Sequence, residues 1–279
     1  MKTAYIQTDI EGVAGYVHYY SRSGSLWNFH HVKRMNRLLT REVNAAAKAL
    51  KKAGYEEIYV NDNHGPAYNI DFEDLDPVCR IIHGRGGYGP SWVPMLERAE
   101  VAVAIGMHAM AGTPNANCNH SLWHLTDGNG NYSQLSEVGM FAHLCHLKGV
   151  KLVAISGDQF VCEEIRGLVP GCEAIEVKES LALEHACALH PDRACLKIEE
   201  GIEAALQRVE QIKMPSKNGP FKLNVSDRDP AIWVLKEDET GNDLWELMHR
   251  VCNINYAKFG ETTSVGDRSW SYPDSVYHK

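Results

Sequence analysis

The stretch EVAVAIGMHA, residues 100–109, decides the fold. Glu100–Gly106 is a nearly continuous apolar run, which is typical of a strand covered on both faces. Strands of this kind belong to parallel sheets with helices packed on each side. Further candidate strands lie at Thr3–Thr8, Glu57–Asn61 and Val150–Ile155. The sequence therefore predicts a buried, mostly parallel sheet.

Helical patterns separate these strands. Phe29–Ala53 carries apolar residues at helical spacing, and Gly54 follows it at the position that favours glycine. Ser136–Leu147, with Ser136 as N-cap, and Gln159–Leu168 are two further predicted helices. Alternation of strand and helix is typical of α/β proteins. We predict an α/β fold with a mostly parallel sheet core and helices on both faces, plus a smaller α+β C-terminal part.

The pattern beyond residue 160 is less regular. It predicts a strand at Ala174–Lys178, a long helix at Asp192–Ile212, a strand at Phe221–Val225 and a helix near Asn242–Asn253. Ser121–Thr126, earlier in the chain, looks like a strand that enters a turn. We expect two domains, residues 1–160 and 161–279.

The composition excludes several classes of function. The 279 residues include 36 acidic and 28 basic ones, a net charge of −8 that argues against binding to nucleic acid or an anionic membrane. No window approaches the roughly 18 apolar residues of a membrane span, and no secretory signal is visible. The eight cysteines are scattered without a C-x-x-C pair, so we expect a cytoplasmic protein. Fourteen histidines are many for this length.

Metal-capable side chains follow three of the core strands. Asp9 and Glu11 follow the first strand, His64 the second, and His108 the apolar run. Because ligands of open parallel sheets bind beyond the carboxyl ends of the strands, these side chains are expected at one edge. Two further candidates are the segment Asn119-His120-Ser121 and Glu137 at the start of a helix.

Each candidate also has a simpler interpretation. An Asp-x-Glu after a strand is often turn and N-cap chemistry, and Asp62 in Asn-Asp-Asn is more typical of a turn than of a ligand. A buried histidine is usually a core residue, as we expect of His143, and Glu137 can favour a helix N-terminus through the dipole. The joint pattern favours a site, because unrelated turns would otherwise place acids and imidazoles at one edge by chance.

Carboxylates and imidazoles without thiolates form a mixed nitrogen and oxygen ligand set, which suits Zn²⁺, Mn²⁺ or Co²⁺. Five protein ligands with one bridging carboxylate fit a two-metal site better than a single tetrahedral zinc. Such a pair lowers the pKa of a shared water, which gives a hydroxide near neutral pH, and it polarises a carbonyl. This chemistry is typical of an amide hydrolase.

At these residues the sequence resembles the D-aminopeptidase family of binuclear zinc peptidases. The likeness runs through roughly residues 3–195 and is carried by Thr8-Asp9-Ile10-Glu11-Gly12, Val60-Asn61-Asp62-Asn63-His64, Gly106-Met107-His108-Ala109, Thr113-Pro114, Asn119-His120-Ser121, Ser136-Glu137-Val138-Gly139, Ser156-Gly157-Asp158 and Val177-Lys178-Glu179-Ser180. Each motif alone is short, but the residues of these motifs and their order along the chain are together specific.

The resemblance implies a set of roles. Two Zn²⁺ ions per chain would be held by Asp9 as the bridging carboxylate and by Glu11, His64, His108 and Glu137, and His120 falls on the family's catalytic histidine. It also implies homo-oligomers, as pentameric rings stacked into decamers around a channel. Residues 1–160 would then form the catalytic domain, and residues 161–279 would make assembly and substrate-channel contacts.

The roles of the remaining polar residues stay open at the level of sequence. A neutral His120 beside two metals suits a general base or an oxyanion donor better than a nucleophile. Asn61, Asn119 and Asp158 are candidates for orienting ligands. Lys178 could meet a substrate carboxylate or a neighbouring acid, although an exposed lysine is the commoner case.

The expected function is a binuclear metal-dependent amide or peptide hydrolase, an aminopeptidase on small peptides that can contain D-amino acids. The C-terminal third departs from the family pattern, which can alter substrate choice and ring assembly. One alternative is therefore a hydrolase of a non-peptide amide, lactam or ester on the same centre, and another is a non-catalytic ring-forming metal-binding protein. A phosphoesterase is disfavoured, since no glycine-rich loop or arginine cluster lies near the motifs.

Overall fold

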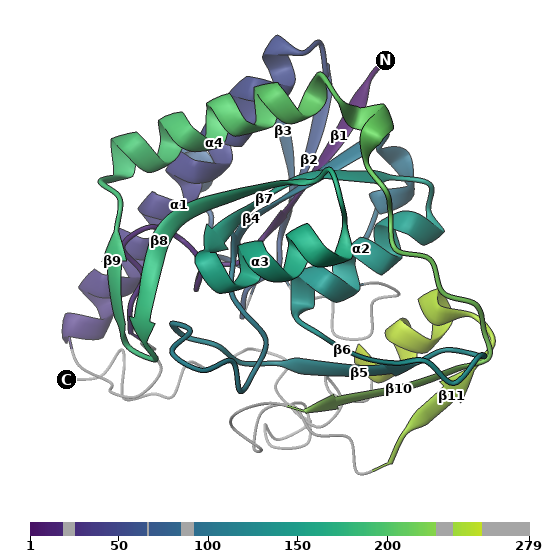
Figure 1. Cartoon of the computed structure of the whole chain (residues 1–279). Coiled ribbons are helices and arrows are strands. Elements are labelled where there is room, and N and C mark those ends of the chain that lie inside the picture. The colour runs from purple at the N-terminus through teal and green to yellow at the C-terminus, as the bar shows by residue number, and fades with distance from the viewer. Residues whose placement is uncertain (19–25, 66, 85–91, 227–236, 253–279) are drawn as a thin grey trace, which may run out of the picture.

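A computed structural model describes residues 1–18, 26–65, 67–84, 92–226 and 237–252. Its centre is a seven-stranded sheet in the order β3-β2-β1-β4-β7-β8-β9 (Figure 1). All neighbouring strands are parallel except β9, which runs antiparallel to β8. The strands are β1 (Thr3–Thr8), β2 (Glu57–Asp62), β3 (Cys79–Ile82), β4 (Val101–Met107), β7 (Lys151–Asp158), β8 (Glu173–Ala182) and β9 (His185–Ala188). The predicted fold class is confirmed.

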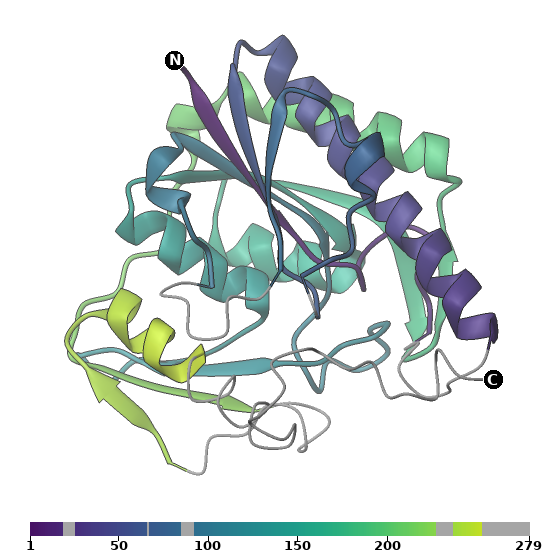
Figure 2. The same ribbon diagram turned by 180° about the vertical axis from the view of Figure 1, so that it is seen from behind.

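Helices cover both faces of this sheet (Figures 1 and 2). The helices α1 (Leu26–Lys52) and α4 (Pro191–Leu206) pack side by side on one face, and α2 (Glu137–Leu147) and α3 (Gln159–Leu168) lie on the other. Gly54 ends α1 as predicted: it adopts a φ of +88°, which glycine tolerates without strain. The sheet is therefore buried on both sides, as the apolar run of β4 requires.

A second, four-stranded antiparallel sheet has the order β11-β10-β5-β6. It consists of β5 (Leu122–Thr126), β6 (Tyr132–Leu135), β10 (Phe221–Ser226) and β11 (Glu239–Gly241). Figures 1 and 2 place it at the bottom of the molecule, beside a helix over residues 244–252. The predicted Ser121–Thr126 strand is thus present, but it pairs with the C-terminal β10 and not with the parallel sheet.

The sheets do not divide the chain at residue 160. The strands β7 and β8 lie on either side of that position and are neighbours in the parallel sheet. Conversely, β5 and β6 precede it and belong to the second sheet. The division into domains 1–160 and 161–279 stays a prediction, and it does not follow the pairing of the strands.

Smaller differences concern short elements. The sequence did not indicate β6, β9 or β11. Short 3-10 turns occur at η2 (Phe72–Asp74), η3 (Leu96–Arg98) and η4 (Val209–Gln211), the last of them inside the Asp192–Ile212 segment that was expected to be α-helical. Among the described residues, no helix combines the length and the apolar character needed to cross a membrane. The chain beyond residue 252, including the end of the predicted Asn242–Asn253 helix, lies outside the described residues.

The core side of α2 contains an ionisable group. His143 is 2% exposed, and its Nε2 has no hydrogen-bond partner among the described residues. Burial, followed by the charges of Lys217 and His146, lowers the pKa of His143 from 6.5 to about 4. The residue therefore fills a packing position as a neutral ring, as the sequence predicted.

This burial gives a test of stability against pH. Between pH 6.5 and 4 the unfolded chain binds a proton at His143 that the folded chain does not, so stability falls as the pH decreases through that interval. We expect the His143 contribution to the loss between pH 7 and pH 4.5 to be about 2–3 kcal/mol. Urea unfolding of His143→Leu at the two pH values should show a loss smaller by that amount. Variant His185→Gln, at an exposed position, should keep the wild-type loss, and an equal loss in His143→Leu would contradict this account.

Candidate metal centre

Six predicted side chains converge at the carboxyl ends of β2, β1 and β4, which are adjacent strands. They form two groups in which the potential ligand atoms all lie within 4.8 Å of one another. One group contains Asp9, Glu11 and His64, and the other contains His108, His120 and Glu137. Each of the first four follows its strand by only a few residues, so the order of the strands is sufficient to bring them together.

Asp9 connects the two groups. Its Oδ1 lies 3.0 Å from Nδ1 of His64, and its Oδ2 lies 3.2 Å from Nε2 of His108. Glu11 Oε2 lies 2.9 Å from the same His64 nitrogen. Burial by itself would raise the pKa of Asp9, but His64 and His108 hold it well below its ordinary value. Asp9 is therefore a buried, charged carboxylate with one oxygen facing each group.

Close backbone contact holds the Asp9 turn against β4. The Asp9 N–H donates to Ile105 O at 2.9 Å, and the Gly12 N–H donates to Gly106 O at 2.7 Å. A Cβ on Gly12 would lie 1.9 Å from Met107 O, and one on Gly106, whose φ is +76°, would lie 2.3 Å from Asp9 O. Only glycine permits this approach, which sets the distance between Asp9 and His108.

A side-chain network positions His64. Asp62 accepts hydrogen bonds from the backbone N–H of Ile70 at 2.9 Å and from Asn69, whose Nδ2 also donates to His64 O at 2.6 Å. Asp62 therefore closes the loop that follows β2, which is the structural role expected for it. Asn69 was not singled out by the sequence, because an asparagine seven residues away has no local signal.

His108 is buried, and its ring orientation is set by the backbone. Its Nδ1 lies 2.8 Å from Ala109 O, which favours a proton on Nδ1 and directs Nε2 toward Asp9 and Glu137. Burial alone would lower the pKa of His108, but the carboxylates of Glu137 and Asp9 raise it to about 10. The site therefore attracts positive charge strongly.

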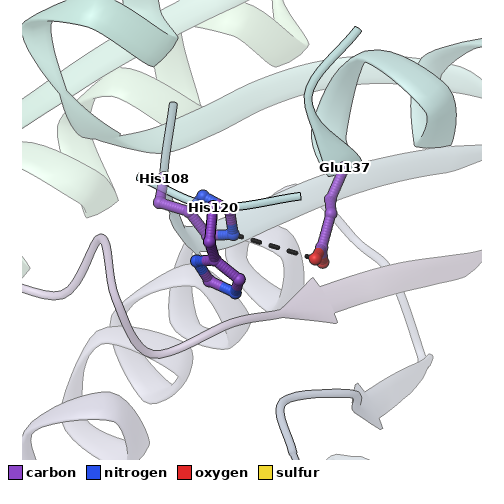
Figure 3. A group of neighbouring side chains, drawn as sticks. All are labelled: His108, His120 and Glu137. Carbon is purple, nitrogen blue, oxygen red and sulfur yellow. Dashed lines mark ion pairs between the residues drawn. The ribbon is translucent and has the colours of Figure 1, made fainter. Parts of the chain in front are cut away.

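Glu137 is the first residue of α2. Ser136 caps the helix by accepting the Gly139 N–H at 3.1 Å, as predicted, and Glu164 of α3 accepts the Ser136 N–H and hydroxyl at 2.9 and 2.8 Å. Burial would raise the pKa of Glu137, but His108 lowers it on balance. The carboxylate points toward His108, with Oε1 3.8 Å from Nε2 (Figure 3).

His120 stacks on His108, with ring centroids 3.9 Å apart and an angle of 18° between the planes (Figure 3). Its Nδ1 lies 3.0 Å from Cys118 O, which favours a lone pair on Nε2. The backbone at Cys118 and Ser121 has φ values of +48° and +52°, a conformation uncommon for residues other than glycine. The loop thus stores strain where it presents this ring.

The residues present fit a pair of divalent cations. Among the described residues, Asp9 Oδ2, Glu11 Oε2 and His108 Nε2 are buried and make no hydrogen bond. Leaving three such buried polar atoms without hydrogen bonds is costly unless a ligand uses them. Ligand atoms of a tetrahedral Zn²⁺ lie about 3.3–3.6 Å apart, and the spacings in this cluster run from 2.9 to 3.8 Å.

Three other candidates make hydrogen bonds to backbone and side-chain groups around the cluster. Asn61 donates to Gln7 Oε1 and Trp92 O, at 2.8 and 3.1 Å. Asn119 accepts the Gly112 N–H at 3.0 Å and so braces the loop before His120. Asp158 caps α3 and accepts the Ser180 hydroxyl. These hydrogen bonds support the backbone segments around the site, and a role of the three residues in orienting the ligands stays a prediction.

Lys178 differs from the common case of an exposed lysine. It is 4% exposed, and its Nζ donates to Glu11 O, to Tyr16 O at 2.9 Å and to Asn117 Oδ1 at 2.7 Å. Its hydrogen bonds therefore go to neutral oxygens and not to a neighbouring acid side chain. The sequence indicated Lys178 as a candidate but gave no indication of the contact with Asn117.

Comparisons with known proteins show that the chain is similar to D-aminopeptidases. The model of a peptidase family described as D-aminopeptidase matches residues 1–233. The D-aminopeptidase of Bacillus subtilis (strain 168) is 23% identical over 209 residues, which cover 75% of each chain. The solved structure of a Zn-dependent D-aminopeptidase from Bacillus subtilis, described as a self-compartmentalizing protease, matches with a TM-score of 0.79 at 21% identity, over 94% of this chain and 99% of that one.

The contact at Gly12 gives a direct test of how the cluster is assembled. In Gly12→Ala the new Cβ would meet backbone atoms of Gly106 and Met107, which cannot rotate away. We expect a loss of more than about 3 kcal/mol in the free energy of unfolding. The matched control is Gly167→Ala in α3, where a Cβ meets nothing within 4 Å, so it should be neutral or stabilising by up to about 1 kcal/mol. Equal stabilities of the two variants in urea would refute this role of Gly12.

Proposed function

The chain belongs to the D-aminopeptidase family, and from that membership we propose that it is a binuclear metal-dependent aminopeptidase acting on small peptides with a free amino group. The observation that carries this proposal is Asp9, whose two oxygens face His64 and His108 in separate groups of potential ligands. A carboxylate shared in this way is the feature that distinguishes a two-metal site from a single-metal site.

We assign three protein ligands to each cation. The first would be held by Asp9, Glu11 and His64, and the second by Asp9, His108 and Glu137. Three protein ligands with an open position are typical of catalytic zinc, whereas structural sites are closed by four. We propose Zn²⁺ because the similar solved structure is described as Zn-dependent. Mn²⁺ or Co²⁺ would suit the same donors.

Two bound cations would lower the pKa of a shared water and polarise the scissile carbonyl. The chain's own residues hold and orient the centre. Asp9, Glu11 and Glu137 supply negative charge in a mostly buried setting, where it is weakly screened. The Nδ1 contacts of His108 and His120 with backbone carbonyls keep both Nε2 atoms in position.

His120 has a different role in this proposal. Because Asp9 already completes three ligands at the second cation, His120 is not required as a ligand although it stacks on His108. A lone pair on Nε2 suits a general base that takes a proton and returns it to the leaving amine. We therefore propose His120 as the catalytic residue.

The proposals for the substrate and for the assembly rest on the relatives and not on the geometry of the site. A preference for D-amino acids is proposed from the activity in the name of the Bacillus protein. Self-association into rings is proposed because the similar structure is described as self-compartmentalizing. A cytoplasmic location remains part of the proposal, together with assembly contacts from residues 161–279.

The experiment that tests the function joins metal analysis to a substrate screen. Protein purified under metal-replete conditions should contain two cations per chain and should cleave aminoacyl amides and dipeptides, including D-configured ones. Fewer than one cation per chain would refute the two-metal assignment. Full loading without any amide cleavage would favour a lactam or ester substrate, or a non-catalytic metal-binding protein.

Substitutions separate the ligand and catalytic roles. We expect Asp9→Asn to weaken the binding of both cations and to abolish activity, because it removes the shared carboxylate. We expect His120→Gln to keep two cations and to lower kcat by about 10²–10⁴-fold, the usual contribution of a general base. Asp127→Asn, in the β5–β6 turn, is the control that should change neither property. Loss of a cation in His120→Gln would make His120 a ligand, and unchanged turnover would remove it from the mechanism.

A further inference from the structure

Lys178 holds an unusual position at the carboxyl end of β8. Its ammonium is buried, and all three of its hydrogen-bond acceptors are neutral: Glu11 O, Tyr16 O and Asn117 Oδ1. An ammonium has three N–H donors and no acceptor, so three oxygens satisfy it completely. An ion pair with a carboxylate does not account for this buried charge.

The first two acceptors belong to the loop that follows β1. This loop carries Glu11, and Lys178 binds the carbonyl of that residue itself. Glu42 of α1 accepts the Ala14 N–H of the same loop at 2.9 Å, and it is also buried. Lys178 and Glu42 thus fix the backbone of the loop from two sides, one as a donor and one as an acceptor.

The third acceptor belongs to the loop that carries His120. Asn117 accepts from Lys178 and donates through Nδ2 to Val17 O at 3.0 Å and to Leu183 O at 2.8 Å. Cys118 is the next residue, and its carbonyl contacts Nδ1 of His120. One ammonium therefore connects the backbone of a candidate ligand with the loop that presents the candidate base.

Burying a lysine is costly compared with burying an apolar side chain of similar length. Methionine at this position would fill a comparable volume but would leave three oxygens without their donor. The position therefore requires three N–H donors. Their three acceptors belong to two different loops, so the lysine holds these two loops together.

We propose that Lys178 is a positioning residue, which sets the backbone of Glu11 relative to the His120 loop and so tunes the first cation site and the proton transfer. This inference rests on the proposed function, because it takes Glu11 as a ligand and His120 as the base. The second group, His108 and Glu137, receives no bond from Lys178 and should be affected less.

The test compares Lys178→Met with a matched control. Lys151→Met removes another lysine that donates to a backbone carbonyl, Ile212 O at 3.0 Å, away from the candidate ligands. Each full-length protein, stripped of metal, is titrated with Co²⁺ while the visible absorption of the bound ion is recorded. Steady-state kinetics follow on the metal-loaded proteins.

In Lys178→Met we expect one of the two Co²⁺ sites to lose about 10–100-fold in affinity, the usual effect of removing a group that orients a ligand. Its absorption spectrum should change, and kcat should fall more than KM rises. Lys151→Met should resemble the wild type in all three properties. A Lys178→Met protein with wild-type affinities, spectrum and kcat would overturn the proposal. A wild-type protein that fails to bind two cations would instead refute the proposed function.

A second variant decides the question if Lys178→Met does not fold. Asn117→Leu removes the acceptor on the His120 loop and leaves Glu11 and Lys178 in place. We expect it to lower kcat about tenfold or more while both Co²⁺ affinities stay near the wild-type values. Unchanged kcat in a folded Asn117→Leu protein would overturn the link between Lys178 and the His120 loop.

Discussion

A single buried carboxylate, Asp9, faces an imidazole with each of its oxygens, and the rest of the site is arranged around that contact. Both imidazoles come from strands next to β1, so the contact exists only because β2 and β4 flank β1 in the sheet. The glycines at 12 and 106 allow the turn after β1 to touch β4 directly. The chemistry of the cluster is therefore a consequence of strand order and of two backbone contacts.

The same constraint explains the electrostatic character of the site. Three carboxylates and three imidazoles share a small, mostly buried space, in which the pKa values of Asp9 and Glu137 are lowered and that of His108 is raised. Without a cation, the carboxylates hold a proton on His108 to well above neutral pH. Behind Glu11, Lys178 donates a hydrogen bond to the backbone carbonyl of that residue. The cluster therefore combines a strong attraction for cations with a backbone that is held in place.

Much of this arrangement could be predicted from the sequence. The apolar run of β4 and the helix of Phe29–Ala53 carry strong local signals, and the polar residues that follow the strands indicated the correct edge. The pairing of β5 with β10 could not be predicted, because no local pattern in Ser121–Thr126 specifies a partner far along the chain. Burial of Lys178 was equally hidden, since its three acceptors come from two distant loops and two of them are backbone oxygens.

The second sheet also constrains the order in which parts of the chain can pair during synthesis. The β5–β6 hairpin lies between the segments that carry His120 and Glu137, and it pairs with β10, so that His124 and Ser226 meet across 102 residues. At about 5–20 residues per second of synthesis, β10 leaves the ribosome roughly 5–20 s after β5. Before then, the edge of β5 has no partner on that side. The hairpin between His120 and Glu137 therefore gains its last strand partner only late in the synthesis of the chain.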